Sequence, residues 1–412
     1  MLKGKRILFI APSSIPIDGP ESIVNIKQLE VLAKSGCIID VVSKKKKKYH
    51  YPYIEKIKKD ICLNSINILE VDNRINWSTI KLHIFTYFTF GVVYKGAHWA
   101  LVALQKCKEL VEKNSYDFVM TKSFPSELVG FWIKKKKGIK WIATWNDPFP
   151  EEKYPIPYGR GIAAKVFWGA KKLIPIMEKF PDFHLFPSER LRNYMMEYLN
   201  ISVQKTAIIP HIVLVDNINK AQILDRRCMK ILHSGNVDYP RNPHILLQAL
   251  NKFVGEYPGV NIEMYFQGVC SENLNKWITE LSLGDIVKVL PATSYTENMN
   301  ILSNYDVLLI IEAPCDEGIF LPTKVSDYMQ TNKIIFAVSP KEGVLHDLYQ
   351  QEYIGYFADC CSEKDVFNEL VHLYNDFVSK KMRKSKIPIE YTPKYVTDKF
   401  DDIFRTLLIE NG

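Results

Sequence analysis

The stretch that most constrains the fold is residues 306–343, in which two apolar runs, DVLLII and IIFAV, lie on either side of a helical segment. Continuous apolar runs of this length are typical of strands buried on both faces of a parallel sheet. Pro322 suits the first turn of the helix, because a missing N–H group has little consequence there. The stretch therefore predicts a strand–loop–helix–strand unit of a doubly wound α/β sheet. Lys324 and Asp327 lie near the carboxyl edge of that sheet, where open α/β sheets bind ligands.

Length and composition indicate a globular protein with two domains. The 412 residues exceed what one hydrophobic core usually supports, and 47% of them are hydrophobic against 24% charged. The apolar run after the basic start is too short for a signal peptide, and no run is long enough to span a bilayer. The eight cysteines have no zinc-binding spacing, so we expect reduced thiols in a cytoplasmic protein.

Positive charge is concentrated in the first half of the chain. Residues 1–210 hold 34 basic and 19 acidic side chains, a net charge of +15, whereas the remainder carries −7. Lysine runs lie at residues 44–48 and 134–137. Residues 77–104 are rich in aromatic side chains and predict one or two amphipathic helices, which either pack inside the domain or lie at a membrane interface. The charge asymmetry predicts that the first domain faces an anionic surface, the inner face of the membrane. Nucleic acid is not an expected partner, because the lysine runs lack interleaved aromatic residues.

The helical segment of the opening stretch carries a family resemblance. The pattern P-x-K-x-x-D-Y, formed by Pro322, Lys324, Asp327 and Tyr328, resembles the donor-site signature of retaining GT-B glycosyltransferases of family four. One subgroup of that family has glutamate where this chain has Asp327. The commoner form has two glutamates eight residues apart, a spacing that Glu312 does not match. The resemblance implies a GT-B architecture, with two doubly wound Rossmann-like domains facing each other across a cleft.

Two further segments are similar to the same family. Residues 140–144 predict a strand, and Asp147-Pro148-Phe149 after it resembles an Arg-Asp-Pro-Trp sequence in which Asn146 takes the place of the arginine. Residues 235–243 resemble the loop and helix start that hold the donor pyrophosphate, with Arg241 in the basic role. In the first loop of the chain, Gly19 is followed by Pro20 where the family often has a second glycine.

The resemblance also implies a domain division. Residues 1–210 form an acceptor-side domain, to which a C-terminal helix at about 394–412 returns. Residues 211–393 form the domain that binds the nucleotide sugar.

The resemblance assigns roles to individual residues. Arg241 and Lys324 meet the negative charge of the diphosphate, and Asp327 accepts hydrogen bonds from the ribose hydroxyls. We expect these three side chains to be partly exposed. Asp147 positions the acceptor, and no D-x-D triplet is present to hold a metal ion, so neither a metal nor another cofactor is expected. The full set of donor-binding residues is Gly235, Arg241, Asn242, Pro322, Thr323, Lys324 and Asp327, with Gly19 from the first loop and with Leu290 and Pro291 at the base.

The implied reaction is transfer of a sugar from a nucleotide diphosphate to an acceptor hydroxyl, with retention, in cell-surface polysaccharide or glycolipid synthesis. The partners are then a nucleotide sugar and a saccharide or lipid-linked saccharide acceptor. Two other functions stay open. One is a catalytically degenerate GT-B protein that binds carbohydrate or nucleotide. The other is an NAD-dependent sugar-modifying enzyme, against which the lack of a dinucleotide fingerprint after the first strand argues, since the G-x-G-x-x-A match at residues 159–164 follows no strand.

Overall fold

The computed structural model describes residues 2–16, 19–45, 59–71, 77–90, 96–214 and 227–409 of the chain. Parts of three predicted features lie outside the described residues, namely 46–48 of the lysine run, 91–95 of the aromatic stretch and 410–412 of the terminal helix.

The chain divides into two compact units. The first contains residues Met1–Lys153, Ile162–Ile212 and Pro393–Gly412, and the second contains Tyr154–Gly161 and Val213–Thr392. Residues Tyr154–Gly161 make their contacts in the second unit, although the predicted boundary at residue 210 places them in the first domain.

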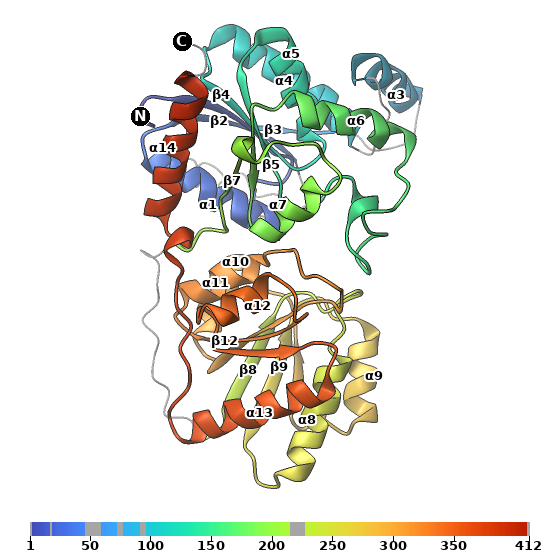
Figure 1. The fold of residues 1–412 in the computed structure, drawn as a ribbon, viewed down its shortest axis with the longest axis vertical. Helices are drawn as coiled ribbons and strands as arrows, with labels where there is room; N and C mark the ends of the chain where they lie inside the picture. Colours follow the sequence, from blue (N-terminus) through green and yellow to red (C-terminus); the bar gives the residue numbers. More distant parts are fainter. Residues whose placement is uncertain are drawn as a thin grey trace. The chain divides into compact units, whose positions relative to one another are not determined.

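The first unit is built on a parallel sheet, whose described strands have the order β3-β2-β1-β4-β5-β6-β7 (Figure 1). The order reverses between β1 and β4, so the chain winds outward in both directions from the first strand, as in doubly wound folds. The strands are β1 (Arg6–Ile10), β2 (Ile38–Lys44), β3 (Ser65–Leu69), β4 (Phe118–Lys122), β5 (Lys140–Thr144), β6 (Phe183–Phe186) and β7 (Thr206–Ile208). The helices of this unit are α1 (Pro20–Lys34), α3 (Trp77–Phe90), α4 (Ala97–Lys113), α5 (Ser126–Lys137), α6 (Trp168–Lys179), α7 (Glu189–Met196) and α14 (Pro393–Ile409).

The last helix of the chain, α14, packs on the first unit. Its Phe404 ring stacks on Phe118 of β4 with 4.0 Å between centroids, and its Asp401 accepts a hydrogen bond from the backbone N–H of Leu2 at 3.0 Å. Its buried residues recur at helical spacing, which defines one apolar face; they are Val396, Phe400, Ile403, Phe404 and Leu407.

The second unit has its own parallel sheet, in which the described strands follow the order β10-β9-β8-β11-β12-β13. The strands are β8 (Met229–Ser234), β9 (Ile262–Gln267), β10 (Val287–Leu290), β11 (Val307–Ile311), β12 (Ile334–Ser339) and β13 (Tyr356–Asp359). The helices are α8 (His244–Glu256), α9 (Glu272–Glu280), α10 (Tyr295–Leu302), α11 (Thr323–Gln330), α12 (Val344–Gln350) and α13 (Glu363–Val378).

Helices cover both faces of the second sheet, which explains its continuous apolar strands. Leu309 belongs to a core cluster with residues of α8, α9 and α13, whereas its neighbours Leu308 and Ile310 belong to a cluster with residues of α10, α11 and α12 (Figure 1). Successive side chains of a strand point to opposite faces, so both sets must be apolar. The predicted architecture of two doubly wound α/β domains is confirmed.

Among the described residues, no helix combines the length and the apolar character needed to cross a bilayer.

Candidate functional site

A group of polar side chains lies at the carboxyl edge of the second sheet. β8 ends at Ser234 and is followed by Gly235, and β11 ends at Ile311 and is followed by Glu312. Helix α11 begins after Pro322, which is its N-cap rather than part of its first turn. Lys324 is the second residue of this helix. Because β8 and β11 are neighbours, the loops that follow them bring these residues together.

Lys324 is held against a buried histidine. Its Nζ lies 3.4 Å from Nε2 of His233, whose Nδ1 lies 3.0 Å from the carbonyl oxygen of Leu309. A carbonyl only accepts, so Nδ1 carries the proton and Nε2 is left to accept from the lysine. Burial, with the nearby charge of Lys324, lowers the pKa of His233 well below its usual value, which keeps this ring neutral. His233 was not singled out from the sequence.

Gly235 leaves room for the lysine. Its backbone has φ of +136°, and a Cβ atom placed on it would lie 2.5 Å from Cε and 2.7 Å from Nζ of Lys324. Any other residue would therefore clash with the lysine and also adopt a conformation that side chains disfavour. In the described structure the side chain that approaches Gly235 most closely is that of Lys324.

Arg241 forms an ion pair with Glu312. Its Nε lies 3.4 Å from Oε1 of the glutamate, and the Tyr158 hydroxyl donates to Oε2 at 2.8 Å. The carbon of the guanidinium group lies 5.8 Å from the centre of the Tyr158 ring. Glu312 is 7% exposed, and its negative charge raises the pKa of Arg241. The sequence gives Glu312 no clear role, and Tyr158, 154 residues away along the chain, no role at all.

Glu312 pairs with Arg241, whereas Lys324 has no such partner in the described structure. Burial and the charge of Arg241 lower the pKa of Lys324 to about 8, and the charge of Glu312 opposes both effects. Within the described part of the chain, no carboxylate lies within ion-pair distance of Lys324. The cluster therefore has excess positive charge at the amino end of α11, where helix N–H groups also favour an anion.

Asp327 lies on the following part of α11 and is 7% exposed, so the expectation of partial exposure is wrong for this residue. The hydroxyl of Tyr295, the first residue of α10, donates to Oδ1 of Asp327 at 2.9 Å. The next residue, Tyr328, is buried, and its hydroxyl accepts from the backbone N–H of Ser234 at 3.0 Å. Tyr328 thus ties α11 to the end of β8, which fixes the position of Lys324 relative to Gly235.

The other residues predicted for the donor site lie around this cluster. Asn242 is exposed, and its side chain accepts from the backbone N–H of His244 at the start of α8. Thr323 opens α11 and is partly exposed. Leu290 ends β10 and is partly exposed, and Pro291 after it is exposed.

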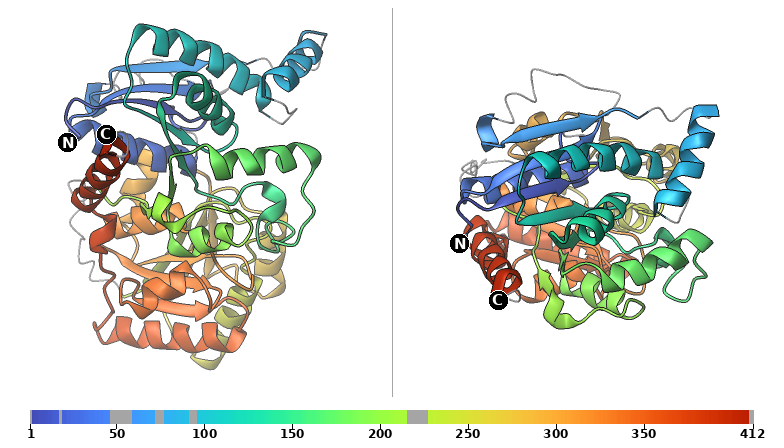
Figure 2. Two further views of the ribbon diagram at one scale, coloured as in Figure 1. Left: turned by 45° about the horizontal axis from the view of Figure 1, so that its top comes forward. Right: turned by 90° about the horizontal axis from the view of Figure 1, so that it is seen from above.

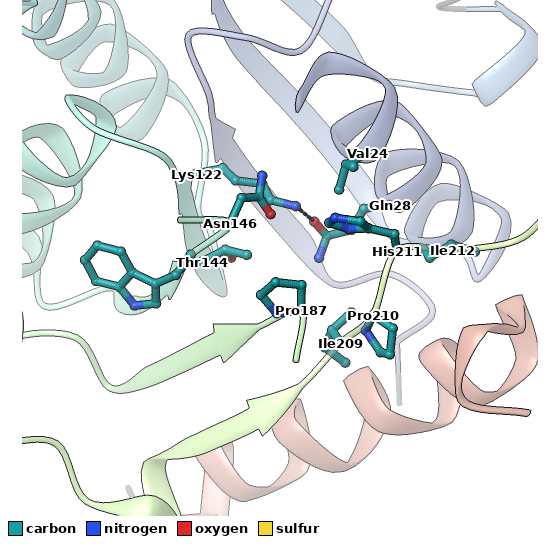
Figure 3. A pocket seen from close by; sticks show the side chains of 11 residues that line it. Val24, Gln28, Lys122, Thr144, Asn146, Pro187, Ile209, Pro210, His211 and Ile212 are labelled. Carbon is teal, nitrogen blue, oxygen red and sulfur yellow. Dashed lines mark hydrogen bonds between the residues drawn. The ribbon is translucent and has the colours of Figure 1, made fainter. Parts of the chain in front are cut away.

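The acceptor-side predictions fall in the first unit. Asp147 is exposed in the segment after β5, while its neighbour Asn146 lines a pocket at the carboxyl edge of this sheet (Figure 3). Gly19 is the N-cap of α1; its backbone is extended, and a Cβ placed on it would meet nothing within 4 Å. The described geometry therefore gives no steric requirement for glycine at position 19.

One group of metal-ligating side chains occurs among the described residues, at the end of β13. It consists of Asp359, Cys360 and Cys361. Asp359 lies 3.5 Å from the ammonium of Lys341, and burial raises the pKa of the Cys360 thiol. We assign this group no role.

Comparison with solved structures identifies the fold. A glycosyltransferase from Rickettsia africae has a TM-score of 0.68 at 12% identity, covering 98% of this chain and 99% of its own. Sucrose-phosphate synthase from Thermosynechococcus elongatus has a TM-score of 0.68 at 14% identity, covering 98% and 100%. HepE from Anabaena, solved with UDP and glucose, has a TM-score of 0.64 at 12% identity, covering 98% and 99%. No protein-family model and no curated protein matches the sequence. The chain has the two-domain α/β fold of GT-B type.

Proposed function

We propose that the protein is a glycosyltransferase that moves a sugar from a nucleoside diphosphate to an acceptor hydroxyl. The observation that carries this proposal is the placement of Arg241 and Lys324 at one sheet edge, where Glu312 is the carboxylate that pairs with Arg241. These cations are 83 residues apart in the sequence, yet the charge of Arg241 lowers the pKa of Lys324. A diphosphate is the leaving group that such a cluster suits best, because its negative charge grows as the bond to the sugar breaks.

In the proposed reaction, the bond between the anomeric carbon and the diphosphate oxygen breaks, and a bond from the acceptor oxygen to that carbon forms. The acceptor attacks on the face that the diphosphate leaves, so the configuration is retained, and a phosphate oxygen takes the acceptor proton. Arg241 and Lys324 stabilise the departing diphosphate, which removes the need for a metal ion. The mechanism requires no protein nucleophile.

The remaining residues orient the two substrates. The buried carboxylate of Asp327, held by Tyr295, faces the ribose hydroxyls in this proposal, and Leu290 with Pro291 contacts the base. Thr323 and Asn242 lie at the starts of the two helices that flank the diphosphate. Asp147, with its exposed carboxylate after β5, positions the acceptor.

Calorimetric titration with UDP, GDP and ADP tests the donor site. UDP is the first choice, because HepE was solved with it. We expect one nucleotide to bind, and the sugar nucleotide of that base to be turned over at the same rate with and without a chelator. The anomeric configuration of the product, determined by NMR, tests retention.

Two results would replace this proposal. Nucleotide binding without turnover on any acceptor would indicate a binding protein on a GT-B frame. Tight binding of NAD, with no affinity for nucleoside diphosphates, would indicate a dinucleotide-dependent enzyme.

We also propose that the first unit docks on an anionic membrane through α3. The polar residues Thr79 and Thr86 of this helix are 4% and 0% exposed, whereas most of its large apolar side chains are exposed. The helix lies beside α4 at the margin of its unit (Figure 2). Exposed apolar patches of this kind mark interaction surfaces. The outward residues are Trp77, Ile80, Ile84, Phe85, Tyr87 and Phe88.

Basic and aromatic groups next to α3 favour a membrane as the occupant. Tyr87 stacks on Trp168 of α6 with 5.7 Å between ring centroids, and the ammonium of Lys172 lies 4.4 Å from the centre of the Trp168 ring. Aromatic rings with lysines beside them suit the interface of an anionic leaflet. The net charge of +15 in residues 1–210 acts in the same direction.

Co-sedimentation with phosphatidylserine-containing vesicles tests the docking surface. We expect the double variant Phe85→Ser with Phe88→Ser to bind at least tenfold less, since burying each aromatic side chain contributes about 1.5–3 kcal/mol. Ile389→Ser removes an exposed apolar side chain from the second unit and serves as the control. Equal binding of the parent to neutral and anionic vesicles would contradict the proposal.

A further inference from the structure

A second polar site lies in the first unit, at the carboxyl edge of its sheet. The empty space at this pocket is about 300 Å³, a figure that includes space open to bulk solvent. Its walls come from α1 and from the ends of β4, β5, β6 and β7 (Figure 3). Open α/β sheets bind ligands at this edge.

Lys122, the last residue of β4, is buried in this pocket. Its side chain is 3% exposed, and its ammonium donates to Oε1 of Gln28 on α1 at 3.0 Å (Figure 3). Within the described ranges, no carboxylate lies within ion-pair distance of it. An ammonium has three N–H donors, so a neutral amide leaves this buried charge both uncompensated and short of acceptors.

Of the acidic groups near this pocket, Glu21 is the one whose charge acts on Lys122. Glu21, at the start of α1, accepts a hydrogen bond from Ser123 and is the group that raises the pKa of Lys122 against the effect of burial. Glu127, on α5, is buried, and burial raises its pKa to about 8, so it is mostly neutral at pH 7. His211, after β7, also lines the pocket and supplies no negative charge.

The pocket walls offer further unused donors. Since Oε1 of Gln28 accepts from the lysine, its amide nitrogen points elsewhere, and this buried Nε2 has no partner among the described residues. The hydroxyl of Thr144, at the end of β5, is likewise buried without a partner in the described structure. Gln28 and Thr144 are 2% and 5% exposed and both line the pocket. The unused hydrogen-bonding capacity is therefore rich in donors and surrounds a cation.

We propose that this pocket binds an oxyanion, the carboxylate or phosphate of a small saccharide, with Lys122 as its ion-pair partner and Gln28 and Thr144 as hydrogen-bond donors. Apolar walls beside these groups suit the carbon face of a sugar ring; they include Val24, Trp145, Pro187 and Ile209. The identification of this ligand as the acceptor rests on the proposed transferase function, and it makes the acceptor an acidic sugar.

The site is tested by measuring the affinity of the full chain for four probes by ligand-observed NMR and calorimetry. The probes are glucuronate, glucose 6-phosphate, inorganic phosphate and neutral glucose. We expect at least one acidic sugar to bind at least tenfold more tightly than glucose. The arms with glucuronate and glucose 6-phosphate decide between carboxylate and phosphate, and inorganic phosphate shows what the oxyanion contributes alone.

The variant Lys122→Met removes the charge and keeps much of the volume. It should lower the affinity for the acidic sugar by about ten- to a hundredfold, which corresponds to the loss of a charge-assisted hydrogen bond. The affinity for glucose should be unchanged. Lys136→Met changes the net charge equally at an exposed position of α5 and should bind like the parent. Thr144→Val is a second variant, with an expected loss of a few-fold. Failure of every acidic probe to bind, or binding by Lys122→Met equal to that of the parent, overturns the inference.

Nucleotide binding separates this inference from the proposed function. If UDP and the other nucleotides fail to bind while the acidic sugar binds through Lys122, the transferase proposal fails and the oxyanion site stands. If a nucleotide binds and is turned over but no acidic sugar is recognised, only the inference fails.

Discussion

The two sheets of this protein each place a lysine at the carboxyl edge, and the two lysines are held in different ways. Lys122 in the first unit is 3% exposed and donates to an amide oxygen. Lys324 in the second unit is partly exposed, lies over Gly235 and has a neutral imidazole as its acceptor. Burial lowers the pKa of both, to about 7 for Lys122 and about 8 for Lys324. The comparison shows two ways in which a lysine is left without a compensating negative charge. Lys122 is buried among neutral groups, whereas Lys324 lies near a second cation, Arg241.

The largest expected effect is on the free energy of unfolding, which the burial of Lys122 lowers. The folded pKa of this lysine, about 7, lies below the ordinary value of 10.5, so between these values the unfolded chain binds more protons and stability rises with pH. Lys122→Met should therefore be more stable than the parent by about 1–4 kcal/mol at pH 6, with a smaller advantage at pH 9. Urea denaturation at both pH values measures this. Lys136→Met is the control, and a variant less stable than the parent at pH 6 would show that the charge is compensated.

The next effect concerns the contribution of Arg241, in the second unit, to diphosphate affinity. Arg241→Ala should weaken UDP, or whichever diphosphate binds, by about ten- to a hundredfold, because a charge-assisted hydrogen bond contributes about 1.5–3 kcal/mol. Uridine, which lacks the phosphates, should be affected much less. Arg227→Ala, an exposed arginine of the same unit, is the matched control in the titration. Equal losses for uridine and UDP would place Arg241 away from the diphosphate.

Substitutions at two glycines distinguish the effect of backbone strain on stability from the effect of the position of Lys324 on binding. Gly235 and Gly259 both have positive φ, but only at Gly235 would a Cβ meet the lysine, since nothing lies within 4 Å of the Cβ position at Gly259. Both Gly→Ala variants should lose about 1 kcal/mol or more of stability, measured by thermal denaturation. Only Gly235→Ala should also weaken the diphosphate, by roughly tenfold through displacement of one charged contact. Unchanged affinity in Gly235→Ala would mean that the lysine position does not matter for binding.

The smallest effect is the pH dependence of nucleotide affinity. Lys324 loses its proton near pH 8, so the affinity of the parent for a diphosphate should fall between pH 7 and pH 9, by at most about tenfold per pH unit for one proton. In Lys324→Met this component should vanish, and the difference between the two titration curves removes any titration of the ligand itself. Parallel curves for parent and variant would exclude Lys324 as the titrating group.

Local patterns were sufficient to predict many elements of the fold. The apolar run at residues 306–311 predicts a buried strand, and β11 is buried at every position. The strand expected at residues 140–144 is β5 with the same bounds. The aromatic stretch at residues 77–104 predicts one or two helices, and its described part contains α3 and the beginning of α4. These predictions succeed because burial on two faces or helical periodicity is written into a few neighbouring residues.

The same stretch shows that local patterns do not predict which face of a helix is buried. Trp99 and Leu104 of α4 are buried, as in an ordinary core helix, whereas α3 buries threonines and exposes Phe85 and Phe88. Hydrophobic periodicity locates the apolar face of a helix, but the direction in which that face points depends on what the helix packs against.

The sequence by itself determined the class of the fold, the apolar strands and the residue types of the donor-site candidates Gly235, Arg241, Lys324 and Asp327. Only the tertiary structure decided which of them meet. The contact of Gln28 with Lys122 spans a sequence separation of 94, and that of Tyr158 with Glu312 spans 154; local periodicity indicates neither. A polar residue reads the same in the sequence whether it is solvated or buried, because its burial is set by the distant elements that fold over it. The state of a charge, and with it the chemistry of a site, is therefore fixed only when the sheet edge is assembled.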